Sequence, residues 1–231
     1  MKDIVQIQKN YGPKLAKAAL SLGAIKLSPD KPFTWASGYR MPIYNDNRQF
    51  LALPEYRALI RDAFAEMVEV LGLGDVENIS GTATAGIPHA TSLADKLGKP
   101  MSYVRSSAKD HGMGNQIEGL AGGSFGGKKV LLIEDLISTG SSSIKALQAI
   151  RQADGLCDTC LAIFTYGLDK AADAFAALTP KCSVYTILDY ATMLETALAD
   201  GYISAEHAES LRQWREDPFA WGEKHGFLKE N

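Results

Sequence analysis

The chain has 231 residues, of which 46% are hydrophobic and 22% are charged, and its formal net charge is −3. This composition is typical of a globular protein with one main core, and it excludes a fibrous or low-complexity chain. The slightly acidic balance gives no support for nucleic-acid binding, which usually leaves a strongly basic footprint.

Targeting and redox signals are weak. The first residues, MKDIVQIQKNYG, lack the basic start and apolar run of a secretion signal. No stretch reaches the roughly 18 apolar residues of a membrane span, so we expect a cytoplasmic protein with no membrane partner. Cys157 and Cys160 form a lone CxxC between a predicted helix and a predicted strand, and Cys182 is single. We interpret all three as core thiols rather than a zinc or redox site.

The chain is expected to form one domain over residues 1–231, beginning with a hood at 1–50. Residues 1–22 predict an amphipathic helix with Leu15, Ala19 and Leu22 on one face. Residues 24–44 are interrupted by prolines and a glycine, which favours short irregular strands.

Residues 55–190 alternate between helical segments and short apolar runs, which predicts an α/β core: a doubly wound, mostly parallel sheet flanked by helices. The predicted strands are Val76–Ser80, Met101–Val104, Val130–Ile133, Cys160–Tyr166 and Ser183–Ile187. The predicted helices are Glu55–Leu71, Ile87–Leu97, Ser142–Ala153 and Lys170–Leu178. In the C-terminal tail, 205–231, a helix at Ala205–Trp214 precedes several aromatic residues that we expect to pack on the domain or on a partner subunit.

A polar, glycine-rich segment, residues 103–123, separates two of the predicted strands. So long a loop in a compact domain is usually functional. Arg105, Lys109 and His111 supply cationic or proton-bearing groups, and Gly112 and Gly114 supply backbone freedom. These features suit a lid over diphosphate, and the alternative is a solvated surface loop.

The stretch VLLIEDLISTGSSS, residues 130–143, is the most informative part of the sequence. An apolar strand brings Glu134 and Asp135 to its carboxyl end, where ligands lie in open α/β sheets. Residues 138–142 then open a helix, and their hydroxyls and N–H groups favour a phosphate. Alternatively, the hydroxyls only cap the helix and the acids are solvated. Paired acids beside a phosphate would repel it unless a sugar and Mg²⁺ lay between, which favours a sugar-phosphate site.

This segment matches neither a Walker loop nor a dinucleotide fingerprint. It resembles the signature of the type I phosphoribosyltransferases, an apolar strand followed by two acids and a Thr/Ser-Gly loop. The resemblance implies that Glu134 and Asp135 approach the ribose hydroxyls of 5-phosphoribosyl-1-diphosphate. It also implies that the adjoining loop binds the 5-phosphate, and the implied substrate-binding residues there are Leu136, Ile137, Ser138, Thr139, Gly140, Ser141 and Ser142.

Two further segments resemble orotate phosphoribosyltransferases in particular. VRSSAKDHG resembles their catalytic loop, although Ser106 stands where many members carry Lys. KPFTWASGYRMPIYNDNR, residues 31–48, resembles their Phe-Thr-x-x-Ser-Gly-x-x-x-Pro segment. The resemblance implies a homodimer with shared active sites, because the lid reaches the neighbouring subunit. It further implies that Lys109, His111 and Asp135 are catalytic.

Orotate is a planar anion, so its pocket needs an apolar wall and a cation. Lys26, Tyr44 and Arg48 are candidates of the right kinds, and the resemblance implies that Lys26 contacts ligand and that Ser138 also touches orotate. SGTATAGIPHA, residues 80–90, fits a further donor-binding loop, although Thr84-Ala85 stands where some members have Tyr-Lys. His89 in this segment favours packing or capping over catalysis.

The resemblance therefore implies Mg²⁺-dependent transfer of ribose 5-phosphate from the diphosphate donor to orotate, giving orotidine 5′-monophosphate. Mg²⁺ would be held mainly through substrate and water, so no dedicated cluster of metal ligands is expected. One alternative is a phosphoribosyltransferase for another base. The other is a non-catalytic regulator that senses phosphoribosyl diphosphate.

Overall fold

The computed structural model describes residues 3–35, 37–106 and 116–229. Within these ranges a six-stranded sheet runs in the order β10-β9-β8-β5-β6-β7, and all neighbours are parallel except β6 and β7. Its strands are β5 (Asn78–Thr82), β6 (Met101–Val104), β7 (Ile117–Glu118), β8 (Lys129–Ile137), β9 (Leu156–Thr165) and β10 (Ser183–Asp189). The expected mostly parallel sheet is confirmed.

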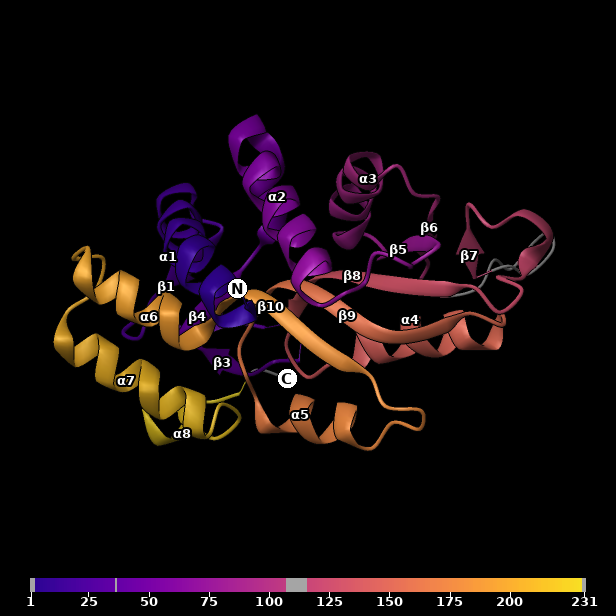
Figure 1. Cartoon of the computed structure of the whole chain (residues 1–231). Helices are drawn as coiled ribbons and strands as arrows, with labels where there is room; N and C mark the ends of the chain where they lie inside the picture. The colour runs from indigo at the N-terminus through magenta and orange to yellow at the C-terminus, as the bar shows by residue number, and fades with distance from the viewer. Residues whose placement is uncertain (1–2, 36, 107–115, 230–231) are drawn as a thin grey trace.

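Helices cover both faces of this sheet. In Figure 1, α1, α2 and α3 lie above it and α4 and α5 lie below it. The bounds are α1 (Ile4–Leu22), α2 (Pro54–Val70), α3 (Gly86–Leu97), α4 (Ser141–Gln152), α5 (Asp169–Ala176) and α6 (Tyr190–Ala199). Of these, α6 was not predicted from the sequence.

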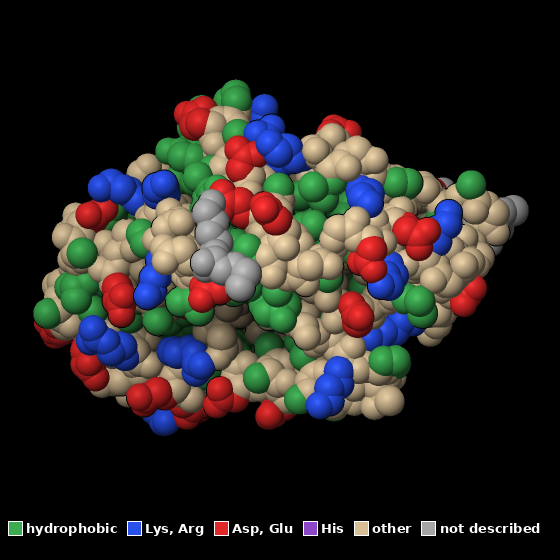
Figure 2. All heavy atoms as spheres, in the orientation of Figure 1, with side chains coloured by type: hydrophobic (Ala, Val, Ile, Leu, Met, Phe, Trp, Pro, Cys, Tyr) green, Lys and Arg blue, Asp and Glu red, His purple; other side chains and the backbone are tan. Residues whose placement is uncertain are grey.

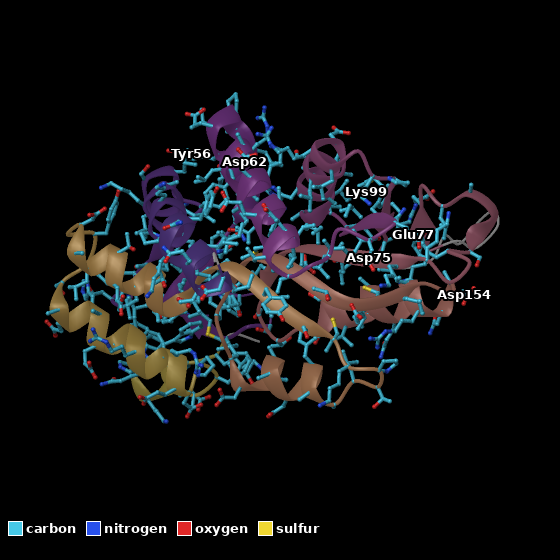
Figure 3. All side chains as sticks on the ribbon, in the orientation of Figure 1. Tyr56, Asp62, Asp75, Glu77, Lys99 and Asp154 are labelled. Carbon is cyan, nitrogen blue, oxygen red and sulfur yellow. The ribbon has the colours of Figure 1, made fainter. Side chains whose placement is uncertain are left out.

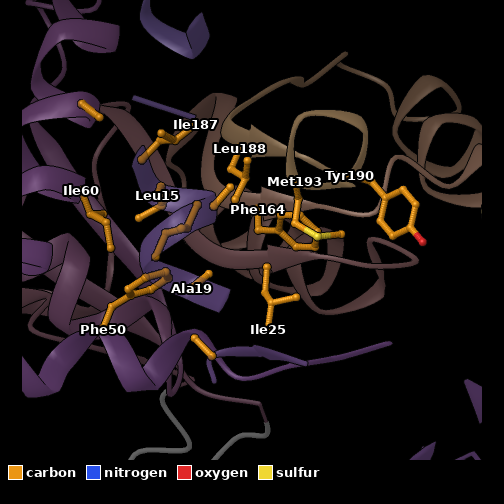
Figure 4. Close-up of a cluster of buried hydrophobic side chains, with 14 of the residues drawn as sticks. Leu15, Ala19, Ile25, Phe50, Ile60, Phe164, Ile187, Leu188, Tyr190 and Met193 are labelled. Atoms are coloured by element: carbon orange, nitrogen blue, oxygen red, sulfur yellow. The ribbon is translucent and has the colours of Figure 1, made fainter. Parts of the chain in front are cut away.

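The alternation of side chains along a strand divides the buried residues into two clusters. On β8, Leu131 and Ile133 belong to the larger cluster, and Val130 and Leu132 belong to the smaller one. The larger cluster also contains buried residues of α1, α2 and α6, some of which are shown in Figure 4. Since apolar side chains pack on both faces of the sheet, β8 is held between two packed layers.

The hood consists of two small antiparallel pairs, β1 with β4 and β2 with β3. Their bounds are β1 (Ile25–Leu27), β2 (Phe33–Thr34), β3 (Arg40–Met41) and β4 (Ile43–Asn45). A 3₁₀ helix, η1 (Asn47–Ala52), follows β4, and a second, η2 (Ala121–Gly123), precedes β8. The short irregular strands expected for this region are confirmed.

The C-terminal tail packs on the hood through aromatic rings. Helices α7 (Ala205–Glu216) and α8 (Trp221–Lys224) carry two fully buried tryptophans, Trp214 and Trp221. The Trp214 ring lies 6.3 Å from that of Trp35, and its Nε1–H donates to Met41 Sδ at 3.1 Å. The hood therefore packs against the last helices of the chain as well as against the sheet.

The three cysteines are free and buried, as expected for core thiols. Their placement needs one correction, because Cys157 and Cys160 lie within β9 rather than between a helix and a strand. Burial raises the pKa of the Cys157 thiol to about 12, so it remains protonated at neutral pH.

Lys and Arg side chains alternate with Asp and Glu over the face shown in Figure 2. Neither sign of charge gathers into one patch on that face. None of the helices in the described part of the chain has the length and apolar character needed to cross a bilayer.

Candidate active site

The two acids lie on β8, a central strand with neighbours on both sides. The sequence predicted that this strand would end at Ile133, but it continues to Ile137, so Glu134 and Asp135 lie within it. The ladder with β5 ends at Ile133, whereas pairing with β9 continues to Ile137. The backbone thus remains in the sheet while one edge becomes open beside the acids.

Glu134 is 3% exposed, and its carboxylate is held by donors on both oxygens. Asp135 N–H donates to Oε1 at 3.0 Å, and Ser143 Oγ–H donates to Oε2 at 2.9 Å. Ser142 Oγ lies farther from Oε2, at 3.4 Å. Ser143 was not among the candidates from the sequence. Its position in the first turn of the helix that follows the acids could have indicated a contact with them.

Burial raises the pKa of both carboxyls. For Glu134 the largest cause is desolvation, followed by repulsion from Asp135. For Asp135 desolvation again dominates, and Arg48 is among the groups that oppose it. Two acids that resist ionising together form a site where a cation or a hydroxyl-rich group is favoured.

The loop after β8 does not use its hydroxyls as helix caps. Helix α4 starts at Ser141 with Gly140 as its N-cap, so that no side chain caps it. Thr139 Oγ1 lies instead 3.2 Å from Ser141 Oγ. The first N–H groups of an α-helix have no partner within the helix, and its dipole favours an anion there. The alternative in which Ser and Thr only cap this helix is not supported.

Glycine is required at Gly140 for two reasons. Its φ is +79°, and a Cβ there would lie 2.9 Å from Phe175 Cε2. At the start of α3, a Cβ on Gly86 would lie 2.6 Å from the Ile133 carbonyl oxygen. Gly86 therefore lets the loop after β5 lie directly against β8.

A hollow of about 210 Å³ brings together three parts of the chain that are distant in sequence. The loop after β5 contributes Thr82–Ala85, and β8 and α4 contribute Glu134, Asp135 and Ser142. The hood contributes Asn45, Asp46 and Arg48, of which only Arg48 was a sequence candidate. Thr82 Oγ1 and both amide atoms of Asn45 are buried without a hydrogen-bond partner.

Arg48 and Lys26, the candidate cations of the hood, lie in different surroundings. Arg48 donates to Asp46 at 2.6 Å, and this hydrogen bond is the main reason that the pKa of Asp46 is lowered. Lys26 pairs with Tyr44 across the β1–β4 ladder, is exposed, and is not among the residues lining the hollow. The Phe33 ring lies 5.8 Å from that of Tyr44. Within the described residues, Arg48 is therefore the hood cation that lines the hollow together with the acids.

The lid segment is described only at its two ends. Arg105, directly after β6, forms an ion pair with Glu118 of β7 at 3.4 Å, and its N–H donates to the Gln116 carbonyl. The expected catalytic residues Lys109 and His111 lie outside the described residues. His89 is buried in α3, and burial lowers its pKa to about 4, which fits a packing role.

A larger cavity, of about 580 Å³, lies away from the acids and is lined by the starts of β8 and β9. Asp75 and Asp154, labelled in Figure 3, are among its lining residues. The loop 138–142 and the acid pair do not line it. The smaller hollow, where hydroxyls, acids and a helix amino terminus converge, is the better candidate for chemistry.

Comparison with known proteins gives a family and several relatives. The family model described as "Phosphoribosyl transferase domain" matches residues 46–187. A Staphylococcus saprophyticus protein named orotate phosphoribosyltransferase is 49% identical over 203 residues, covering 88% of this chain and 97% of that protein. A Bacillus caldolyticus protein of the same name is 49% identical over 208 residues, covering 90% and 98%. The solved orotate phosphoribosyltransferase of Aeropyrum pernix superposes with a TM-score of 0.68 at 27% identity, covering 82% and 99%.

Proposed function

The chain belongs to the phosphoribosyltransferase family and has its type I fold, and we propose that it is an orotate phosphoribosyltransferase. It would transfer ribose 5-phosphate from 5-phosphoribosyl-1-diphosphate to orotate, a step of pyrimidine nucleotide synthesis. The observation that carries the proposal is the hollow in which the acid pair, the hydroxyl-rich loop and the hood meet. The names of the relatives indicate which base is the acceptor.

The donor would occupy the side of the hollow formed by β8 and α4. Residues 138–142, with Leu136 and Ile137 before them, would surround the 5-phosphate, because the uncapped amino terminus of α4 offers N–H groups and a favourable dipole. Glu134 and Asp135 would accept hydrogen bonds from the ribose hydroxyls. Their placement beside the sugar also favours the positive charge that grows on it as the diphosphate leaves.

The site fits Mg²⁺ bound together with the substrate. Two carboxyls with raised pKa values, Glu134 buried and Asp135 partly buried, favour a cation beside them. Within the described residues, no group of three or more His, Cys, Asp or Glu side chains could hold a metal alone. Glu134 and Asp135 would therefore hold the ion through the ribose hydroxyls and water. When bound, Mg²⁺ would supply charge neutralisation for the diphosphate.

The acceptor would lie against the hood. Phe33, Tyr44 and Lys26 lie together there, and Arg48 lies on the side nearer the acids. In the reaction, the bond from the sugar C1 to the diphosphate oxygen breaks, and the electron pair leaves with the diphosphate. N1 of orotate forms the new bond to C1, and its proton passes to the departing diphosphate. No covalent nucleophile of the protein is required.

The lid, residues 103–123, would complete the site by covering the bound diphosphate. Arg105, Lys109 and His111 would stabilise the leaving diphosphate, and closure would exclude the water that otherwise hydrolyses the donor. We also propose that residues 1–231 act as one domain, with the hood at 1–50, the core at 55–190 and the tail at 205–231. Two such chains would form a homodimer in which each lid serves its neighbour's site.

The test is consumption of orotate by the purified protein, followed optically with and without the donor and Mg²⁺. We expect loss of orotate only when both are present. Activity with hypoxanthine and none with orotate would assign the site to another base. Donor binding with no turnover of any base would instead indicate a sensor.

A second experiment tests the lid. Lys109→Ala should lower turnover by about a hundredfold or more, because one donor to the leaving group is lost, while the donor still binds. Lys128→Ala, at the opposite end of β8 from the acids, is the control and should retain wild-type turnover. If lids cross between subunits, mixing Lys109→Ala with Asp135→Asn should restore activity in the hybrid dimers. Mixtures no more active than either variant would contradict the shared site.

A further inference from the structure

One side chain of the hood bonds directly to the strand that carries the acids. Asn47, the first residue of η1, is 1% exposed, and its Nδ2–H donates to the backbone carbonyl of Asp135 at 2.8 Å. The two residues are separated by 88 positions in the sequence. The bond therefore joins the hood to the core at the catalytic strand.

Asparagine at position 47 does not give this buried site its greatest stability. Its amide Oδ1 is buried and has no hydrogen-bond partner among the residues that the structure describes, and a buried polar atom without a partner costs free energy. An apolar side chain here would remove that cost, and the Asp135 carbonyl would then lose this donor. The presence of an amide here points to the one bond that its N–H group makes.

The carbonyl that accepts this bond lies where β8 loses a neighbour. Pairing with β5 ends at Ile133, so Asp135 lies past the end of the ladder on that side of the strand. The Glu134 carboxylate is fixed separately, by Ser143 and by the Asp135 N–H. Asn47 thus bonds to the second acid of the pair from the hood.

The residues on either side of Asn47 form the hood wall of the hollow. Asn45, Asp46 and Arg48 line it, opposite Glu134 and Asp135. A shift of this segment relative to β8 would change the width of the hollow. The width matters for any transfer between a group bound on the hood and a group bound on the acids.

We propose that Asn47 is a positioning residue, whose hydrogen bond to the Asp135 carbonyl sets the distance between the acceptor bound by the hood and the sugar bound by the acid pair. The inference rests on the proposed function. In this proposal Asn47 does not contact the substrates. Its substitution should therefore slow the transfer step and leave binding of the donor unchanged. Misplacement of reacting groups by about 1 Å can cost on the order of a hundredfold in rate.

The test is Asn47→Leu, which removes the donor and keeps a similar volume. We expect kcat for orotate to fall about ten- to a hundredfold, while the Kd of the donor, measured by calorimetry, changes less than about threefold. The ratio of diphosphate released to orotidine 5′-monophosphate formed should rise above one, because a misplaced acceptor lets water compete. The urea midpoint should change little, because removal of the unpaired Oδ1 offsets loss of the hydrogen bond to the Asp135 carbonyl.

Gln49→Leu is the matched control. Gln49 lies on the same 3₁₀ helix, is exposed, and donates only to Asp46, at 3.2 Å, so this variant should retain wild-type kcat. If Asn47→Leu does not fold, Asn47→Asp decides the question, because it keeps the shape and replaces the donor by an acceptor.

An unchanged kcat in the folded variant would overturn the inference. A parallel loss of donor affinity and kcat would also overturn it, because Asn47 would then support the donor site itself. A wild type that converts no orotate would overturn the proposed function, and this inference with it.

Discussion

Ser143 provides a direct test of how the first acid is held. Its hydroxyl is fully buried and donates to Glu134 Oε2 at 2.9 Å, and Glu134 is itself 3% exposed. Ser143→Ala removes this donor and leaves the carboxylate with the Asp135 N–H and the more distant Ser142 hydroxyl. The variant should therefore be less stable and should also bind a proton more readily at Glu134.

The size of the effect depends on the charge of Glu134. A hydrogen bond to a charged group contributes about 1.5–3 kcal/mol and one between neutral groups about 0.5–1.5 kcal/mol. Burial raises the pKa of Glu134, so the group is protonated in mild acid and ionised in base. We expect Ser143→Ala to lower the free energy of unfolding by about 2 kcal/mol near pH 9 and by about 1 kcal/mol near pH 5. The difference corresponds to a further rise of about 0.7 in the pKa of Glu134.

Urea unfolding of the ligand-free protein at the two pH values measures both costs. Ser142→Ala is the control, because its hydroxyl lies 3.4 Å from the same oxygen and its residue is exposed. It should cost less than about 0.5 kcal/mol at either pH. Equal costs of Ser143→Ala at the two pH values would refute the reasoning, because the bond would then not be to an ionised carboxylate.

Two further predictions concern stability. Burial lowers the pKa of His89 from 6.5 to about 4, so between these values the unfolded chain binds a proton that the folded chain does not, and stability falls as the pH falls. The wild type should lose about 3 kcal/mol more than His89→Leu across this window in urea titrations, and parallel curves would count against a neutral buried imidazole. Gly86→Ala should cost about 1–3 kcal/mol, because the new Cβ would meet the Ile133 carbonyl at 2.6 Å. Gly74→Ala, with nothing within 4 Å of its Cβ, should cost far less, and equal thermal midpoints for the two variants would contradict the packing argument.

The elements of the core followed from local patterns. Met101–Val104 was predicted with the bounds that β6 has, and the helix predicted to end at Leu97 does end there, with Gly98 as its left-handed C-cap at φ +62°. The end of β8 was predicted too early, at Ile133, because acidic residues after an apolar run usually mark the end of a buried strand. The strand in fact ends at Ile137. The strand continues because its backbone still pairs with β9, while the side chains of the two acids line the hollow.

Helix α6 was missed although a signal was present. The side chain of Asp189 accepts a hydrogen bond from Thr192 N–H, an ordinary helix cap visible as Asp followed by a helix-forming run. The predicted core ended at residue 190 and its last predicted strand at Ile187, so the residues after Asp189 were not assigned to a helix. In the structure β10 continues to Asp189, and the same residue is the N-cap of α6.

The strand-loop-helix at 130–143 could be recognised in the sequence because its acids, hydroxyls and glycine are consecutive, and a phosphate site of this kind needs only local backbone geometry. The hydrogen bonds and contacts that hold this segment in place could not be recognised in the sequence. Asn47 reaches Asp135 across 88 residues, and Arg48 rather than Lys26 lines the hollow, because these contacts depend on how the hood packs on the sheet. The sequence alone thus determined which groups could bind a sugar phosphate, and the tertiary structure decided which side chains surround them, since packing brings together residues whose spacing along the chain carries no such information.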